Sequence, residues 1–217
     1  MKLKSMMVLV LGLLPNSILK TCALRFTGWE IGKKARISPN LFLNTSKVSI
    51  GSGAQIRAFN IFRNVSLEVG AESIIGSFNW VGAARGLSEL PNFKGLLSLG
   101  QHSAINSRNY FDVSGGVIFG DFSDLAGVRS TFITHQIELS ASIQTCNTIE
   151  IGNHTMICSN SILVPGGTQI GNRCLFAMGS VIRAGNYPSG GFYAGMPAIF
   201  KKNTSGVWFI RKIGSTG

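Results

Sequence analysis

The stretch Ile151-Gly152-Asn153-His154-Thr155-Met156 begins a run in which a large apolar residue returns every six positions, at Ile157 and Leu163. Pairs of an aliphatic residue and glycine recur along the chain: Ile31-Gly32, Ile50-Gly51, Val69-Gly70, Ile75-Gly76, Leu99-Gly100, Ile151-Gly152 and Ile170-Gly171. A small residue stands four places after the aliphatic one in most of these units. A six-residue repeat of this kind predicts a parallel β-helix, in which each unit forms one face of a triangular coil.

Each residue type has a place in such a coil. The aliphatic side chain points inward and fills the prism, and the small residue sits near a corner where neighbouring coils crowd. Glycine permits tight turns between faces, where a positive φ or a close approach of the backbone excludes larger side chains. Polar residues such as Asn153, His154 and Arg173 are expected to project into water. Glycines of ordinary turns would not keep one six-residue register over so many copies.

Composition agrees with a solenoid. The chain has 217 residues, of which 27 are glycine and 13% are charged, and such a core is filled by stacking of coils and not by amphipathic helices. Cys22, Cys146, Cys158 and Cys174 form no CxxC pair. We interpret them as reduced core or corner residues rather than as disulfides.

Residues 1–30 differ from the repeats. The run from Met6 to Leu14 is apolar, follows Lys2 and Lys4, and is shorter than the ~20 apolar residues that cross a bilayer. Two interpretations stay open: a helix that caps the solenoid, or a segment that associates peripherally with an anionic membrane. The predicted organisation is this short helical segment, a β-helix over residues 31–202 and a C-terminal tail over residues 203–217.

The net charge of +11 is unevenly spread. No Asp or Glu follows Glu150, whereas six basic residues do: Arg173, Arg183, Lys201, Lys202, Arg211 and Lys212. Such a stretch attracts phosphates. The aromatic interleaving of single-strand binders and the known nucleic-acid motifs are missing, so we expect no nucleic-acid partner. A phosphorylated cofactor is the favoured ligand, and a solvated basic tail is the alternative.

An ordered series of motifs resembles the hexapeptide-repeat acyltransferases, in the branch of the maltose/galactoside and colanic-acid-type O-acetyltransferases. The motifs occupy residues 105–112, 115–121, 134–135, 148–157, 163–168, 179–182 and 194–198. The resemblance implies a left-handed parallel β-helix, a homotrimer, and acetyl-CoA in the groove between subunits. The left hand comes from the resemblance alone, because crossover connections are usually right-handed.

Acyl transfer from a thioester to a hydroxyl needs a base, a donor for the developing oxyanion and aligned substrates. Histidine suits the first task. His102 and His154 fall at corner positions of the repeat, whereas His135 opens an irregular stretch, Gln136 to Asn147, that interrupts it. The resembled family has its catalytic histidine there. We predict that His135 is the general base of a direct transfer without an acyl-enzyme, the alternative being a structural loop histidine.

Other site residues are assigned by the resemblance. Asn106 and Asp112 match positions near the acceptor, and the alternative is that both hydrogen-bond their own turns. A backbone N–H near Ser159 is the expected oxyanion donor. A carboxylate or backbone carbonyl should fix the tautomer of His135, and Glu138 is a nearby candidate in the sequence.

The resemblance also implies a coenzyme A site, in which small residues let the pantetheine arm approach the backbone. Its residues are Ser159, Ala177, Gly179, Ser180, Gly195, Pro197, Lys201 and Lys202. The last two would meet the phosphates as point charges. Arg183-Ala184 replaces the usual Thr-Lys pair of the family, which leaves phosphate charge to Arg183, and Met156 replaces a tryptophan.

The resemblance therefore implies an acetyl-CoA-dependent O-acetyltransferase that modifies a sugar hydroxyl in capsule, exopolysaccharide or O-antigen biosynthesis. The basic, apolar N-terminus favours a lipid-linked glycan acceptor and a place in the cytoplasm, on the inner face of the cytoplasmic membrane; a soluble sugar is the other option. An N-acyltransferase acting on a nucleotide-linked amino sugar and a non-catalytic scaffold are alternatives. A zinc-dependent carbonic anhydrase also uses this fold, but its ligands include a close histidine pair that this chain lacks, so no metal is expected.

Overall fold

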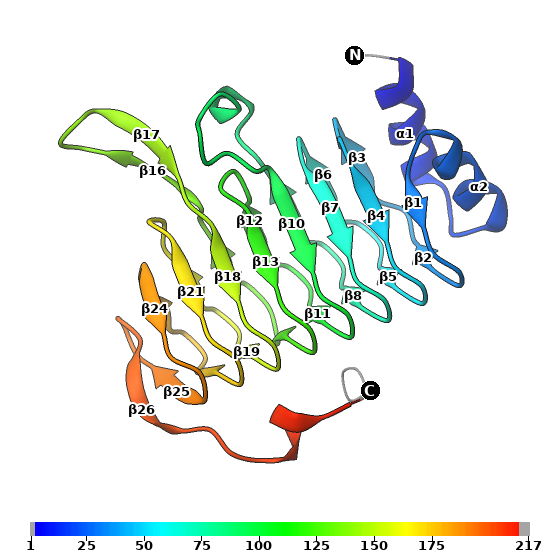
Figure 1. The fold of residues 1–217 in the computed structure, drawn as a ribbon. Helices are drawn as coiled ribbons and strands as arrows, with labels where there is room; N and C mark the ends of the chain where they lie inside the picture. The colour runs from blue at the N-terminus through cyan, green and yellow to red at the C-terminus, as the bar shows by residue number, and fades with distance from the viewer. Residues whose placement is uncertain (1–2, 213–217) are drawn as a thin grey trace.

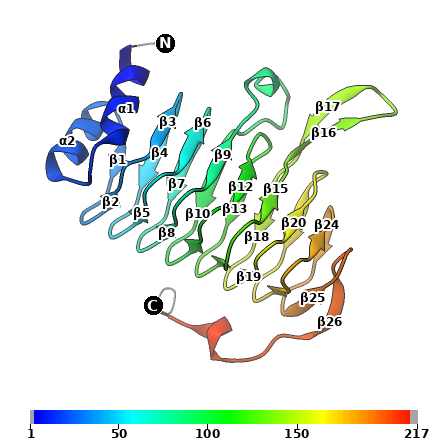
Figure 2. The ribbon, with the colours of Figure 1, turned by 180° about the vertical axis from the view of Figure 1, so that it is seen from behind.

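The structure, a computed structural model, describes residues 3–212 as a stack of triangular coils with two helices at one end (Figures 1 and 2). Each of the first seven coils contributes one strand to each of three sheets, and the strands of successive coils pair in parallel. The last coil adds one strand to each of two sheets, and the final strand of the described residues pairs antiparallel with its neighbour. The chain descends through the front sheet of Figure 1, rises through the sheet facing the viewer in Figure 2, and advances away from the helices. It is a left-handed parallel β-helix, which confirms the predicted fold class.

The strands follow one another around the coils in a fixed order. Sheet A contains β1 (Glu30–Ile31), β4 (Val48–Ile50), β7 (Ser66–Val69), β10 (Leu96–Leu99), β13 (Val117–Phe119), β18 (Ile149–Ile151), β21 (Thr168–Ile170) and β24 (Gly185–Tyr187). Sheet B contains β2 (Arg36–Ile37), β5 (Gln55–Ile56), β8 (Ile74–Ile75), β11 (Ala104–Ile105), β14 (Asp124–Leu125), β19 (Met156–Ile157), β22 (Leu175–Phe176), β25 (Gly191–Ala194) and β26 (Ile199–Asn203). Sheet C contains β3 (Leu41–Leu43), β6 (Ile61–Arg63), β9 (Trp80–Gly82), β12 (Tyr110–Asp112), β15 (Thr131–Phe132), β20 (Ile162–Leu163) and β23 (Val181–Ile182).

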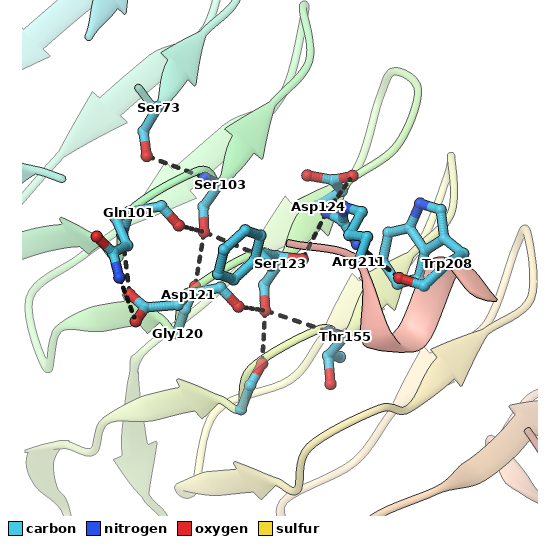
Figure 3. A network of polar contacts seen from close by, with 12 residues as sticks. Ser73, Gln101, Ser103, Gly120, Asp121, Ser123, Asp124, Thr155, Trp208 and Arg211 are labelled. Carbon is cyan, nitrogen blue, oxygen red and sulfur yellow. Dashed lines mark hydrogen bonds and ion pairs between the residues drawn. The ribbon is translucent and has the colours of Figure 1, made fainter. Parts of the chain in front are cut away.

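The small residue of each repeat unit joins the coils at the corner between sheets A and B. These residues form a buried column: Ala54, Ser73, Ser103, Ser123, Thr155 and Cys174. The hydroxyl of Ser123 donates to the carbonyl of Gly152 at 2.6 Å and accepts the N–H of Thr155 at 3.2 Å (Figure 3). A small hydroxyl side chain thus satisfies buried backbone groups of the next coil, which an apolar side chain could not do.

The glycine after each aliphatic residue is required by close packing, not by its φ angle. A Cβ on Gly51 would lie 2.5 Å from the backbone nitrogen of Ala71, and one on Gly152 would lie 2.7 Å from that of Asn172. The positive φ occurs two residues after the glycine, where residues such as His102 and His154 have φ angles of 55° and 53°. Of the two reasons given for glycine at these positions, the close approach of the next coil is therefore the correct one.

The N-terminal segment forms α1 (Leu3–Leu13) and α2 (Ile18–Phe26), which pack on the first coil. Gly12 lets α1 approach β3, because a Cβ there would lie 2.8 Å from both the carbonyl oxygen of Asn40 and the ring of Phe42. The buried ammonium of Lys20 donates to the carbonyls of Gly12, Leu14 and Ser38 at 3.0, 2.7 and 3.0 Å. In residues 3–212, neither helix has the length and apolar character of a membrane span.

Two excursions leave the corner between sheets C and A. One is a loop that holds the short 3₁₀ helix η1 (Arg85–Leu87), and the other is an antiparallel hairpin of β16 (His135–Glu138) and β17 (Ile143–Cys146). Both project from the stack in Figure 1. The stretch Gln136 to Asn147, which the sequence indicates only as irregular, is mostly this hairpin.

The described part of the C-terminal tail runs back along the coils. After β26 the chain forms the 3₁₀ helix η2 (Val207–Ile210) and brings Arg211 to the fifth coil (Figure 3). There Nη2 of Arg211 donates to the carbonyl of Phe122 at 2.6 Å and lies 3.2 Å from Oδ2 of Asp124. Burial raises the pKa of Asp124 to about 6, and the charge of Arg211 opposes this rise. Arg211 therefore packs against the coils and is not part of a solvated basic tail.

Replacing Arg211 with methionine should lower the free energy of unfolding by about 3 kcal/mol near pH 8 and by less near pH 5, because it leaves Asp124 without its cation. Since the folded pKa of Asp124 is raised from 3.8 to about 6, its ionised form is disfavoured in the fold, and stability is lost as the pH rises through 6. Urea unfolding at the two pH values measures this, with the exposed Arg173→Met as control. An equal loss at both pH values would contradict the prediction.

Candidate active site

His135 lies at the base of the hairpin, directly after the buried strand β15. Phe132 and Thr134 are buried, at 0% and 1% exposure, and they anchor the chain where it leaves the coil. Nδ1 of His135 lies 2.8 Å from Oδ2 of Asp112, whose side chain is 5% exposed while that of His135 is 36% exposed. Because Asp112 ends β12 and β12 pairs with β15, the coil stacking itself brings this carboxylate and imidazole together.

Asp112 is held rigidly by its neighbours. Oδ1 accepts the hydroxyl of Ser114 at 2.6 Å, and Oδ2 accepts the N–H and hydroxyl of Thr134 at 2.7 and 2.8 Å and the N–H of His135 at 3.1 Å. Burial raises the pKa of Asp112, but the hydrogen bonds from Ser114, His135 and Thr134 outweigh it, so the pKa lies below its ordinary value. The carboxylate is therefore ionised at neutral pH.

An ionised, immobile carboxylate against Nδ1 determines how the imidazole can act. It favours the proton on Nδ1 and leaves Nε2 with a free lone pair, which is the tautomer a general base requires. Nδ1 itself is inaccessible to solvent, so the 36% exposure of the side chain belongs to its other atoms. The arrangement suits proton abstraction from a bound hydroxyl or amine.

Of the residues predicted around His135, the structure brings only Asp112 into contact with it. Glu138 accepts the hydroxyl of Ser140 at 2.7 Å and lies three residues along the strand, where side chains point to the other face. Asn106 is exposed and follows β11, at the far end of β12 from Asp112. The carboxylate that orients the imidazole is thus Asp112 and not Glu138; the acceptor-binding roles of Asn106 and Asp112 remain predictions.

Most of the residues predicted for coenzyme A gather along another edge of the prism, the corner between sheets B and C, whereas Arg183 follows β23 at the opposite end of sheet C. The N–H of Gly179 donates to the carbonyl of Ser159 at 3.0 Å, and the N–H of Val181 donates to that of Gly195 at 3.0 Å, so Ser159, Gly179 and Gly195 stand on successive coils. Ala177 and Pro197 lie at the same corner. Small side chains on three neighbouring coils leave this edge of the backbone accessible to a narrow ligand.

The remaining predicted residues of that site differ in accessibility. Ser180 is fully buried and donates to the carbonyl of Ala177 at 2.7 Å, so its side chain faces the interior. Arg183, Lys201 and Lys202 are exposed, and Nζ of Lys202 lies 5.9 Å from the centroid of the Phe192 ring. Lys201 and Lys202 belong to β26, beside the last coil, where their charges are free to meet an anion.

Within one chain His135 and the coenzyme A edge lie at different corners. His135 follows the end of sheet C, whereas Ser159 and Gly179 precede its start, with a whole strand of sheet C between them. The outer face of sheet C carries a row of exposed apolar side chains, including Trp80, Tyr110 and Ile162 at 42, 46 and 43% exposure. Within one chain, the histidine and the residues predicted for coenzyme A are therefore separated by this apolar face.

A cleft separates the hairpin from the loop that precedes β10. It has a volume of about 560 Å³, and its lining combines the amide side chains of Asn92, Gln136 and Gln144 with apolar ones such as Leu90 and Ile143. Asn92 and Asn147 also line a polar hollow of about 410 Å³ over sheet A, beside Lys94 and Glu150. The N–H of Asn147 donates to the carbonyl of Thr134, the residue before His135, at 2.8 Å. Amide side chains of this kind are suited to sugar hydroxyls.

The other two histidines have structural surroundings. The ring of Phe122 lies between those of His102 and His154, with centroid distances of 4.8 Å to each. Burial is the main cause that lowers the pKa of His154. His154 is therefore partly covered and not simply projected into water. In residues 3–212 no three His, Cys, Asp or Glu side chains converge as a metal site would require.

No family model and no curated protein sequence matches the chain. Solved structures with the same fold include hexapeptide-repeat acyltransferases. A maltose O-acetyltransferase from Clostridium difficile 630 is 19% identical, with a TM-score of 0.52 over 64% of this chain and 70% of its own. A hexapeptide-repeat acetyltransferase from Vibrio cholerae is 22% identical, with a TM-score of 0.50 over 63% and 73%.

A mutant of AntD, an N-acyltransferase from Bacillus cereus in complex with dTDP and coenzyme A, is 17% identical. Its TM-score is 0.57 over 84% of this chain and 88% of its own. At such identities the similarity defines the fold.

Proposed function

We propose that the protein is an acyltransferase that transfers the acetyl group of acetyl-CoA to a hydroxyl group of a sugar. The observation that carries the proposal is the buried, ionised Asp112 2.8 Å from the half-exposed His135. This pair supplies an oriented base at the foot of a hairpin, on a fold whose solved relatives are acyltransferases. No nucleophilic serine or cysteine is needed, since the thioester is already activated.

In the proposed reaction, Nε2 of His135 takes the proton of the acceptor hydroxyl as its oxygen attacks the thioester carbonyl. The C–S bond then breaks, the acetyl group forms an ester with the acceptor, and the proton on His135 passes to the departing thiolate. Asp112 stays ionised and stabilises the transient imidazolium. A general base of this kind contributes about 10²- to 10⁴-fold to the rate.

The position of the coenzyme A edge supports a homotrimer. We propose that acetyl-CoA binds along Ser159, Ala177, Gly179, Gly195 and Pro197 of one subunit and meets His135 of its neighbour in the groove between them. Arg183, Lys201 and Lys202 would bind the phosphates. The exposed apolar row on sheet C, together with Leu139 at the hairpin tip at 86% exposure, gives subunit association a hydrophobic driving force.

The proposed acceptor is a sugar or a lipid-linked glycan of capsule, exopolysaccharide or O-antigen biosynthesis, on the cytoplasmic side of the membrane. The amide side chains of Asn92, Gln136 and Gln144 in the cleft beside the hairpin support a hydroxyl-bearing acceptor. An N-acyltransferase acting on a nucleotide-linked amino sugar is the second candidate, because the fold is shared with the N-acyltransferase AntD and the same base would serve an amine. A non-catalytic scaffold would not require an oriented, solvent-facing histidine.

Release of free thiol from acetyl-CoA, followed with free sugars, lipid-linked glycans and amino sugars as acceptors, tests the proposal. We expect turnover only with an acceptor that carries a free hydroxyl, and a product whose acetyl group hydroxylamine removes, because esters react with hydroxylamine and amides resist it. A hydroxylamine-resistant product would assign the N-acyltransferase. Failure of the protein to bind coenzyme A would indicate the scaffold.

A further inference from the structure

The two N-terminal helices carry exposed apolar side chains that no other part of residues 3–212 covers. On α1 the exposed side chains recur at the helical period: Leu3, Met6, Met7, Val10 and Leu13. On α2 they are Ile18, Leu19 and Phe26, at 83, 82 and 93% exposure. The residues that α1 buries, Val8 and Gly12, lie on its opposite side. A helix that is apolar on both sides requires a second apolar surface in addition to the coil it packs on.

The contacts of these helices hold that face outward. Gly12 lies so close to β3 that no larger residue fits there, and Lys20 fastens the link between the helices to three carbonyl groups. Oδ1 of Asn16 also accepts the N–H of Ile37 at 2.9 Å. Rotation of either helix to bury its exposed stripe would break these contacts, so the exposure is built into the fold.

The charge around this face indicates what covers it. In residues 3–36 the exposed basic residues are Lys4, Arg25, Lys33, Lys34 and Arg36, and the exposed acidic residue is Glu30. A second copy of the chain placed symmetrically on this face would bring like charges together. An anionic lipid surface meets both requirements, because acyl chains accept the apolar side chains while the headgroups attract the basic ones.

We propose that α1 and α2 form a membrane-docking surface that binds anionic lipid bilayers peripherally. The apolar side chains of both helices enter the interface, and Lys33 and Lys34 contact the phosphate groups beside it. Because the helices lie at one end of the stack (Figure 1), the coils extend away from the bilayer. This docking is separate from the proposed reaction, and vesicle binding can be measured without any turnover of acetyl-CoA.

Co-sedimentation of the full-length protein with phosphatidylcholine vesicles, with and without phosphatidylglycerol, tests this docking. We expect binding to the anionic vesicles that weakens as salt is added, and a reduction of about tenfold or more in the double variant Ile18→Ser, Leu19→Ser. The matched control is Val207→Ser, Ile210→Ser on η2, whose apolar side chains are also largely exposed, at 82 and 65%. The double variant Lys33→Gln, Lys34→Gln should bind the vesicles with phosphatidylglycerol more weakly than the wild type does. Its behaviour with pure phosphatidylcholine vesicles should equal that of the wild type.

Thermal unfolding and size-exclusion chromatography of all variants accompany the binding assay. Unchanged unfolding and an unchanged oligomeric state, with loss of vesicle binding confined to the helix and lysine variants, would support the docking surface. Wild-type protein that ignores both kinds of vesicle would overturn it, as would equal losses in the helix variant and its control. A helix variant that changes oligomeric state but binds vesicles normally would assign the face to a second copy and also overturn it.

Discussion

Alanine in place of His135 is expected to lower the turnover of acetyl-CoA by about 10²- to 10⁴-fold, because the acceptor hydroxyl then loses its general base. Coenzyme A affinity should stay within about twofold, since the proposed coenzyme A edge lies at another corner of the coil. The reduction should appear in kcat, as is typical of an interaction made mainly in the transition state. Thiol release at saturating acceptor and a direct measurement of coenzyme A binding separate the two effects.

His102→Ala is the matched control. His102 stacks on Phe122 at another corner and has no carboxylate partner among the described contacts, so its loss should leave turnover unchanged. Normal turnover in the His135 variant would contradict the assignment of His135 as the general base. Equal losses in the two variants would point to a general effect on the fold.

Asparagine in place of Asp112 should lower kcat by about 10²-fold or more while the protein remains folded. The amide cannot stabilise the imidazolium, and its NH₂ group, if it faces Nδ1, selects the tautomer with the proton on Nε2. Because hydrogen bonds lower the pKa of Asp112, its contribution to stability is present above its ordinary pKa of 3.8 and is lost as the pH falls through the lower folded value. The free energy of unfolding of the variant should therefore depend less on pH in the acid range than that of the wild type.

Two further variants separate positioning from packing. Asp121→Asn changes a carboxylate that accepts the N–H of Gln101 at 2.9 Å, and we expect it to keep full activity. Asp112→Glu keeps the charge and should recover part of the kcat that asparagine loses. An Asp112→Asn enzyme with wild-type kcat and an unchanged pH profile would show that Asp112 serves the fold alone.

The role of Asp112 illustrates what could not be predicted from the sequence. His135 and Asp112 are 23 residues apart, so no local spacing connects them, whereas Glu138 is near in sequence but points to the other face of its strand. The signal that could have found the pair was the length of one coil. Residues at equivalent positions of neighbouring coils pair across sheet C, as Phe111 and Phe132 do, and Asp112 and His135 lie one and three residues beyond this pair.

The N-terminal segment is a second case. The sequence left a solenoid cap and a membrane segment as alternatives, and in the structure both helices pack on the first coil while an apolar face stays exposed. Two residues hold the helices on the first coil. Gly12 permits the close approach to β3, and Lys20 is a charged residue whose burial a hydropathy pattern does not predict.

By itself the sequence determined the parallel β-helix and the catalytic candidate, because a period of six constrains every coil and one histidine breaks the repeat. The tertiary structure decided the partner of that histidine, the reason for the repeated glycines and the direction of the apolar helix faces. Each of these depends on which residues of separate coils or elements come within contact distance, and that follows from the stacking of coils rather than from local sequence. The left hand was implied by the resemblance and confirmed by the fold, since a repeat length does not fix the sense of winding.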